Sequence, residues 1–214
     1  MQQNEPAVVT AGHTINWARY YDLLVSMLTL GRSGSMRERT VELAEITAGE
    51  DVLDVGCGTG DLTMVAGKRS GAAGRVHGID AAPEMIAVAR RKAARLGLKI
   101  DYSVAAAEDL PFADSSFDVV LSSLVMHHLP DDLKRTALAE IRRVLRPGGR
   151  LLVIDLKRSS GRSNHLSPVL LLHRHMSHGV QDLPQALEDA GFTSVESGEA
   201  VFGWLGFARG RVRK

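Results

Sequence analysis

One segment constrains the fold of this chain more than any other: a short apolar run that leads directly into a cluster of glycines. Residues 51–55 have the pattern of a buried strand, and residues 61–70 have that of a helix opened by Asp61. The turn between them reads Gly56-Cys57-Gly58-Thr59-Gly60. Such a unit presents backbone N–H groups beside a helix N-terminus, and glycine permits both close approach of a ligand and positive φ. The segment therefore predicts a binding turn for a polar or anionic ligand.

The rest of the chain alternates strand and helix patterns, as in a parallel sheet with helical crossovers. The expected strands are residues 51–55, 75–79, 99–104, 117–122 and 150–155, and the expected helices are residues 61–70, 83–96 and 131–145, the last one stopped by Pro147-Gly148-Gly149. A helix near residues 182–190 precedes two strands, 193–196 and 201–208, with a turn at Gly198 between them. We predict a three-layer, Rossmann-like α/β fold with a mostly parallel seven-stranded sheet that ends in an antiparallel hairpin.

Length and composition favour one globular domain. The 214 residues suffice for a single core, and fractions of 44% apolar and 24% charged residues are ordinary for such a domain. We expect a flexible N-terminus over residues 1–12 and one domain over residues 13–214. Within it, residues 13–48 are expected to form leading helices or a lid, and residues 157–180 an insertion on the substrate side.

Net charge and cysteine content limit the kinds of binding partner and the cellular compartment that we expect. A net charge of +1 gives no large field to attract nucleic acid, and the single cysteine, Cys57, excludes an internal disulfide. The N-terminal residues do not resemble a secretory signal, and the apolar stretches fall short of the roughly 18 residues that span a bilayer. We expect a cytoplasmic protein with no nucleic-acid partner and no stable membrane insertion, and we leave a homo-oligomer open.

Two aspartates beside the glycines indicate a nucleoside cofactor. Asp80 ends the next predicted strand, 20 residues after Gly60, where a carboxylate accepts the hydroxyls of a ribose. A nicotinamide dinucleotide would satisfy this arrangement nearly as well. However, the turn reads G-x-G-x-G where the dinucleotide fingerprint reads G-x-G-x-x-G. Asp54, two residues before the first glycine, would also repel a pyrophosphate but attract an ammonium group.

Further motifs follow in a fixed order along the chain. They are Tyr21-Asp22, residues 52–60, residues 78–85 (Gly-Ile-Asp-Ala-Ala-Pro-Glu-Met), residues 107–112 (Ala-Glu-Asp-Leu-Pro-Phe), residues 116–120 (Ser-Phe-Asp-Val-Val), His127-His128-Leu129 and residues 145–149 (Leu-Arg-Pro-Gly-Gly). With these motifs, residues 20–156 resemble the class I methyltransferase family, in particular its branch similar to the ubiquinone/menaquinone C-methyltransferases. The resemblance implies S-adenosylmethionine as methyl donor.

The resemblance also implies which residues bind that cofactor. Those expected around the methionine moiety are Asp54, Gly56 and Gly58, and Asp80 would hold the ribose. Those expected around the adenine are Ala81, Met85, Ala107 through its backbone N–H, and Glu108; the set is completed by Tyr21, Cys57 and Ser122. Many relatives read Gly-Asp-Ala-Glu where this chain reads Ala105-Ala106-Ala107-Glu108, so an aspartate that contacts the adenine amine there is Ala106 here.

His127 and His128 are the candidate catalytic residues. They follow the predicted strand 117–122 at its carboxyl end, where open α/β sheets gather their ligands, and imidazole titrates near neutral pH. A sulfonium methyl is already activated, so transfer needs mainly positioning, but a base within reach of an acidic acceptor adds about 10²–10⁴ in rate. The alternative is that these histidines cap a helix or pack in the loop.

The acceptor is expected to be a small apolar or aromatic molecule. The Asn/Asp-Pro-Pro-aromatic signature of exocyclic-amine methylation is absent at Ser122-Ser123, and the cysteine pair expected for methylation of pyrimidine C5 in RNA is also absent. Residues 165–178 contain four histidines, but His173 and His175 would point apart on a helix, so we predict no metal there and interpret the segment as a lid or partner surface.

Two roles are open for the aromatic residues of the leading segment, Trp17, Tyr20 and Tyr21: they close over the cofactor, or they pack in the core. The function predicted for the chain is methyl transfer from S-adenosylmethionine to such an acceptor, with release of S-adenosylhomocysteine. Two alternatives stay open: a non-catalytic protein that binds the cofactor for regulation or scaffolding, and an NAD-type oxidoreductase.

Overall fold

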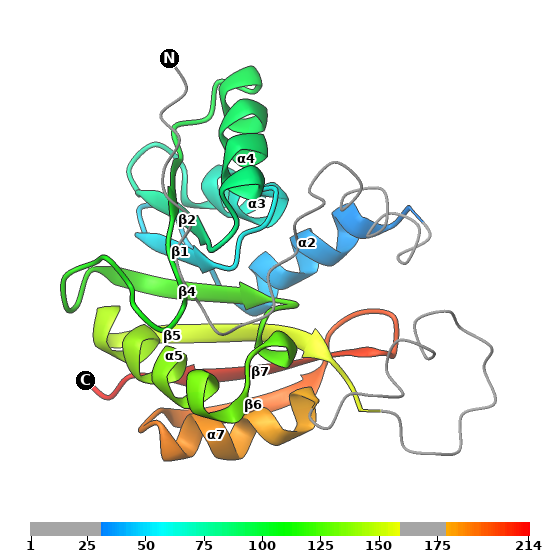
Figure 1. Cartoon of the computed structure of the whole chain (residues 1–214), viewed down its shortest axis with the longest axis vertical. Coiled ribbons are helices and arrows are strands. Elements are labelled where there is room, and N and C mark those ends of the chain that lie inside the picture. The colour runs from blue at the N-terminus through cyan, green and yellow to red at the C-terminus, as the bar shows by residue number, and fades with distance from the viewer. Residues whose placement is uncertain (1–30, 159–178) are drawn as a thin grey trace.

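The computed structural model describes residues 31–158 and 179–214, which form one seven-stranded sheet flanked by helices (Figure 1). The strands are β1 (Val52–Val55), β2 (Val76–Asp80), β3 (Asp101–Val104), β4 (Phe117–Ser123), β5 (Leu145–Leu156), β6 (Thr193–Glu199) and β7 (Leu205–Arg211). The helices are α2 (Ser33–Leu43), α3 (Asp61–Ser70), α4 (Pro83–Arg95), α5 (Asp131–Val144) and α7 (Leu183–Asp189), with short 3₁₀ turns η1 (Met126–His128) and η2 (Val180–Asp182).

The order of the strands in the sheet is β3-β2-β1-β4-β5-β7-β6. The first five strands along the chain pair in parallel, whereas β7 runs antiparallel to both β5 and β6. The chain order reverses between β1 and β4, and such a switch point is where α/β sheets bind ligands beyond the carboxyl ends of their strands. The predicted fold class is confirmed.

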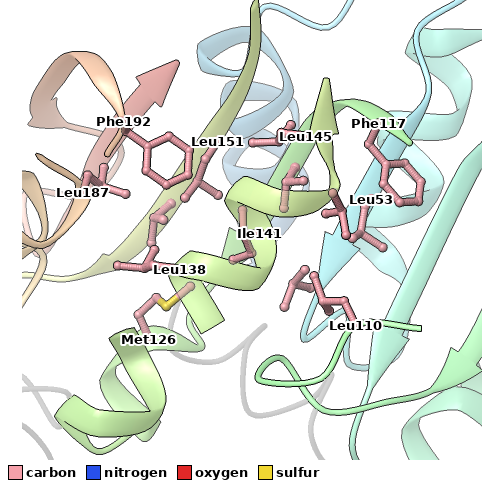
Figure 2. Packing of buried hydrophobic residues seen from close by; sticks show 14 of the residues in the cluster. Leu53, Leu110, Phe117, Met126, Leu138, Ile141, Leu145, Leu151, Leu187 and Phe192 are labelled. Atoms are coloured by element: carbon pink, nitrogen blue, oxygen red, sulfur yellow. The ribbon is translucent and has the colours of Figure 1, made fainter. Parts of the chain in front are cut away.

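Alternating side chains of the central strands fill two separate cores, one on each face of the sheet. Leu53, Val120 and Leu151 pack on the face covered by α5 and α7, and Figure 2 shows this cluster extending from Phe117 to Phe192. Val52, Val119 and Leu121, one position away along the strands, pack on the opposite face under α2 and α3. Helix α4 lies beside α3 against β2 and β3. These three layers hold the carboxyl ends of β1, β2 and β4 at one edge.

Two predicted boundaries are wrong near the C-terminus. Gly198 is not a turn residue, because it lies within β6 opposite Phe207, and a Cβ at Gly198 would come within 2.8 Å of that ring. The hairpin turns instead between β6 and β7, where Phe202 and Gly203 both have a φ of +64°, so the last strand is Leu205–Arg211 rather than residues 201–208.

The helix before β5 also ends earlier than predicted. It stops at Val144, and β5 starts at Leu145, so Pro147-Gly148-Gly149 lies inside the strand instead of ending the helix. There the pairing of β4 with β5 is irregular, and Gly148 has a φ of +82°. The residue before a proline avoids the α region, which moves the helix end upstream.

Several predictions fall outside the described residues. These are the flexible N-terminus over residues 1–12, the aromatic residues Trp17, Tyr20 and Tyr21, and the His-rich segment 165–178. In the described part of the chain, no helix is both long and apolar enough to cross a membrane.

Candidate functional site

The glycine turn joins β1 to α3, and geometry requires glycine at two of its positions. Gly56 has φ +73°, and a Cβ there would lie 2.3 Å from Cγ2 of Val125. Gly60 has φ +81°, and a Cβ there would lie 2.6 Å from the Tyr102 hydroxyl oxygen. Positive φ at these positions agrees with the prediction from the sequence. At both positions the obstacle is a protein side chain, so these two glycines allow the turn to pack closely against its neighbours.

Asp54 places a buried carboxylate at the base of the turn. Its exposed fraction is 1%, and its Oδ2 accepts a hydrogen bond of 2.6 Å from Thr63 Oγ1. Burial raises the pKa of Asp54 to about 7; the Thr63 hydrogen bond opposes this shift and the Asp80 charge adds to it. Among the described residues no Lys or Arg forms an ion pair with Asp54. A buried carboxylate without a cation favours a ligand that brings a positive charge.

Asp80, at the end of β2, holds the turn from the other side. Its Oδ2 accepts a hydrogen bond of 2.9 Å from the Gly58 N–H, and its Oδ1 accepts one of 2.9 Å from the Ala82 N–H. Burial raises its pKa, and these two bonds oppose that shift. Each oxygen keeps a lone pair, since a carboxylate accepts about four hydrogen bonds. Asp80 thus fixes the backbone of the turn and can still accept ribose hydroxyls.

The residues expected near the adenine lie on or beside two neighbouring connections. Ala81 lies in the β2–α4 connection, and Met85 lies in the first turn of α4, where it is buried against Ala82 and Val88. Ala107 and Glu108 follow β3 and are partly buried. The two connections are tied together where the Ala105 N–H donates to the Asp80 carbonyl at 3.1 Å. The structure therefore brings these residues to the edge of the sheet that carries Asp80.

Cys57 and Ser122 differ in what they can offer a ligand. The thiol of Cys57 packs in a core with Met64 and Tyr102, and burial raises its pKa well above the usual range. Ser122, near the end of β4, is 1% exposed, and its hydroxyl has no hydrogen-bond partner among the described residues. A buried hydroxyl without a partner is unusual in a folded protein. Ser122 can therefore take a polar ligand atom or a water, whereas Cys57 contributes mainly its backbone.

A histidine–aspartate pair stands at the ends of β4 and β5. His127 Nδ1 lies 2.6 Å from Asp155 Oδ1, and the His127 backbone N–H donates to Asp155 Oδ2 at 3.0 Å. The His127 side chain is 12% exposed and that of Asp155 is 2% exposed. Because the carboxylate accepts, we assign the proton to Nδ1, which leaves Nε2 with a lone pair and no protein partner in the described ranges. The His128 ring lies beside that of His127, 3.8 Å between centroids.

An open pocket lies in front of the glycine turn. The turn and its flanks line it with Asp54, Gly56, Cys57, Thr59, Asp61 and Leu62; the end of β4 contributes Ser123 and Leu124; and α2 contributes Met36, Arg37 and Thr40. His127 lines a smaller pocket at the end of the neighbouring strand. The predicted cofactor residues Asp54, Gly56 and Cys57 thus share one pocket.

Sequence reasoning missed three residues that shape this site. Asp155 orients His127, Thr63 holds Asp54, and Arg37 reaches the pocket from α2. Asp155 was within reach of prediction, because it ends a strand that a parallel sheet places next to β4. Arg37 gave no such signal, since α2 has no marked apolar face that identifies its packing.

Comparison with known proteins agrees with this geometry. Residues 52–149 match the protein family described as a methyltransferase domain. A demethylmenaquinone methyltransferase of Thermus thermophilus is 43% identical over 135 residues, covering 63% of this chain and 60% of that protein. The ubiquinone/menaquinone biosynthesis C-methyltransferase UbiE of Burkholderia mallei is 34% identical over 158 residues, covering 74% of this chain and 64% of that protein. The chain thus spans about three fifths of the length of these relatives.

A solved structure extends the match. The crystal structure of an S-adenosylmethionine-dependent methyltransferase from Aquifex aeolicus superimposes with a TM-score of 0.65 at 26% identity, covering 82% of this chain and 89% of that one.

Fold and site together define a Rossmann-like methyltransferase domain. More particularly, residues 52–149 match the methyltransferase-domain family, and the chain is similar to the UbiE-like branch of the class I S-adenosylmethionine-dependent methyltransferases, as its motifs predicted.

Proposed function

We propose that this chain transfers the methyl group of S-adenosylmethionine to a small apolar or aromatic acceptor and releases S-adenosylhomocysteine. The observation that supports the proposal is that residues suited to bind a nucleoside cofactor and a histidine suited to act as a base lie at one edge of the sheet. Asp54, Asp80 and the glycine turn offer a nucleoside cofactor site at β1 and β2. The His127–Asp155 pair offers a general base at β4 and β5.

The residues present fit S-adenosylmethionine better than a dinucleotide. Asp54 is a buried carboxylate in the pocket, where it would attract the ammonium of the methionine moiety and repel a pyrophosphate. Asp80 retains acceptor capacity for the ribose, and the unpartnered hydroxyl of Ser122 is suited to another polar atom of the cofactor. The cofactor supplies an electrophilic methyl group on a sulfonium, so the protein needs to supply position and a base.

His127 has the geometry of a general base. Asp155 holds its ring and fixes the proton on Nδ1, so that Nε2 can accept a proton from an acidic acceptor. The acidic partner is nearly fully buried, and it stabilises the imidazolium that forms when the proton arrives. The His128 ring lies beside this ring, tilted by 42°.

A reduced quinone ring is the acceptor that we propose in particular. The similar proteins named above are, by their names, a demethylmenaquinone methyltransferase and a ubiquinone/menaquinone C-methyltransferase. On a hydroquinone, His127 would take the phenolic proton; the ring carbon next to that oxygen would then attack the methyl group, and loss of its own hydrogen as a proton would restore the aromatic ring. A hydroquinone acceptor therefore gives the base at His127 a proton to remove, and removal of that proton makes the ring carbon nucleophilic.

An assay with defined acceptors tests the proposal. The protein is incubated with S-adenosylmethionine labelled in its methyl group and with demethylmenaquinol, demethylmenaquinone or a simple catechol, and products are separated by mass spectrometry. We expect label on a ring carbon of the reduced quinone and equimolar S-adenosylhomocysteine. Cofactor binding without turnover on any acceptor would favour a regulatory protein, and binding of NAD in place of S-adenosylhomocysteine would favour an oxidoreductase.

A further inference from the structure

The cofactor pocket contains one cation on its α2 side that the sequence motifs do not assign. Arg37 lines this pocket together with Asp54, and its side chain is 16% exposed. Helix α2 lies beside α3, so Arg37 reaches the pocket from outside the strand–turn–helix unit (Figure 1). The cation and the buried carboxylate thus belong to different elements that meet in one pocket.

The present partner of Arg37 is Asp61, at the first position of α3. Arg37 Nη2 lies 2.9 Å from Asp61 Oδ2, while the other oxygen of Asp61 lies 2.7 Å from Lys92 Nζ on α4. Lys92 Nζ also donates to Thr59 Oγ1 in the glycine turn, at 3.0 Å. Asp61 therefore keeps a cationic partner if Arg37 turns some of its five N–H donors toward a ligand.

We propose that Arg37 binds the α-carboxylate of the cofactor's methionine moiety while Asp54 binds its α-ammonium. The proposal rests on the proposed function, because it assigns the end of S-adenosylmethionine farthest from the adenine. An amino-acid zwitterion needs one anionic and one cationic group, and the pocket offers both. A guanidinium also matches a carboxylate with two parallel hydrogen bonds, which an ammonium does not.

The competing interpretation is that Arg37 only ties α2 to α3 through Asp61. The two interpretations differ in which ligands should bind more weakly when the guanidinium is removed. Loss of an ion pair that only holds α2 against α3 would change the affinity of every ligand of the pocket alike, because it acts through the position of α2. A carboxylate contact affects only ligands that carry the carboxylate.

The experiment measures binding of three ligands by calorimetry to wild-type protein, Arg37→Met, Arg37→Lys and the control Arg39→Met. Arg39 lies on the same helix, pairs with Glu42 on the surface, and does not line the pocket. The ligands are S-adenosylhomocysteine, decarboxylated S-adenosylmethionine, which keeps the ammonium, and 5′-methylthioadenosine, which lacks both charged groups. The melting temperature of each variant is recorded alongside.

We expect Arg37→Met to weaken S-adenosylhomocysteine about 10- to 100-fold and to leave the other two ligands within about twofold. Arg37→Lys should restore part of that affinity, and Arg39→Met should bind all three ligands like the wild type. Equal losses for all three ligands, or no loss for S-adenosylhomocysteine, would overturn the assignment of Arg37. Failure of the wild-type protein to bind S-adenosylhomocysteine would instead overturn the proposed function itself.

Discussion

Two aspartates at opposite ends of strand β1 have pKa values that shift in opposite directions. Asp51 stands just before the strand and Asp54 near its end, three residues further on. The pKa of Asp51 is held far below its usual range, whereas that of Asp54 is raised to about 7. The same residue type at the two ends of one strand therefore carries a fixed negative charge at one edge of the sheet and a titratable group at the other.

Arginines account for the behaviour of Asp51. Arg75 donates to both of its carboxylate oxygens, and Arg146 Nη2 donates to Oδ2 at 2.8 Å. Arg146 also pairs with Asp118, whose carboxylate accepts the Asp51 N–H at 2.9 Å. This network links β1, β2 and β4 at their amino ends, and its charges are balanced within the protein.

Asp54 has hydrogen bonding but no such balance within the described residues. Thr63 donates to it, and Asp80 adds a second negative charge nearby. Ligands of open α/β sheets bind beyond the carboxyl ends of the strands, which is the end of β1 where Asp54 lies. The charges at Asp51 hold strands together, whereas the negative charge at Asp54 is not balanced within the described residues, as the proposed binding of a cofactor ammonium requires.

The largest effect is expected at a histidine of the binding edge. His127→Gln should lower kcat for an acidic acceptor about 10²- to 10⁴-fold, because the base is lost, while affinity for S-adenosylhomocysteine stays near that of the wild type. Steady-state kinetics and calorimetry check this. His77 on β2 is the matched histidine near the opposite edge, packed edge-on against Phe112 and Phe117. His77→Gln should cost stability and leave kcat of the folded protein intact; a kcat loss equal to that of His127→Gln would break the comparison.

The next effect is expected at Asp54. Asp54→Asn should weaken S-adenosylhomocysteine about 10- to 100-fold, since it removes a charge-assisted hydrogen bond to the ammonium. The pKa of Asp54 is raised by folding, so the stability it contributes is present below its unfolded pKa, about 3.9, and is lost as pH rises through about 7. The variant should therefore gain melting temperature relative to wild type at pH 8 and not at pH 4. A variant that binds as tightly as wild type would contradict the role of Asp54.

The smallest effect on binding is expected at Asp51. Asp51→Asn should lower the free energy of unfolding by about 1–3 kcal/mol through weakened hydrogen bonds to charged groups, and cofactor affinity should not change. Folding lowers the pKa of Asp51, so its stabilisation is present above about 3.9 and lost as pH falls below that value. Urea unfolding from pH 7 to pH 3 should show the gap between wild type and variant closing. A gap that widens in acid would show that the arginine network does not act as described.

The sequence predicted the fold well because its information is local. Each strand and helix at the cofactor edge has its own pattern, and the glycine turn and Asp80 lie at a spacing that depends on one strand–helix–strand unit. The hairpin turn was predicted wrongly because Gly198 was interpreted as a turn residue. Its actual role is to leave room for the Phe207 ring, a contact that local pattern does not reveal.

The site was predicted less completely because some of its pairs are distant in sequence. His127 and Asp155 are 28 residues apart and meet only because β4 and β5 are neighbours. Thr63 was read simply as a helix residue, although one turn of α3 brings its hydroxyl to Asp54. Arg37 depends on where α2 packs, which a helix with a weak apolar face does not specify.

The affinity of wild-type protein for S-adenosylhomocysteine between pH 6 and pH 8 tests the central claim most directly. The claim is that Asp54 is a titratable group reserved for the cofactor's ammonium. With a pKa of about 7, its ionised fraction rises across this range, so binding should tighten about tenfold, with the midpoint near pH 7. The same titration of Asp54→Asn should be flat. A flat profile for the wild type, or tighter binding in acid, would contradict the account.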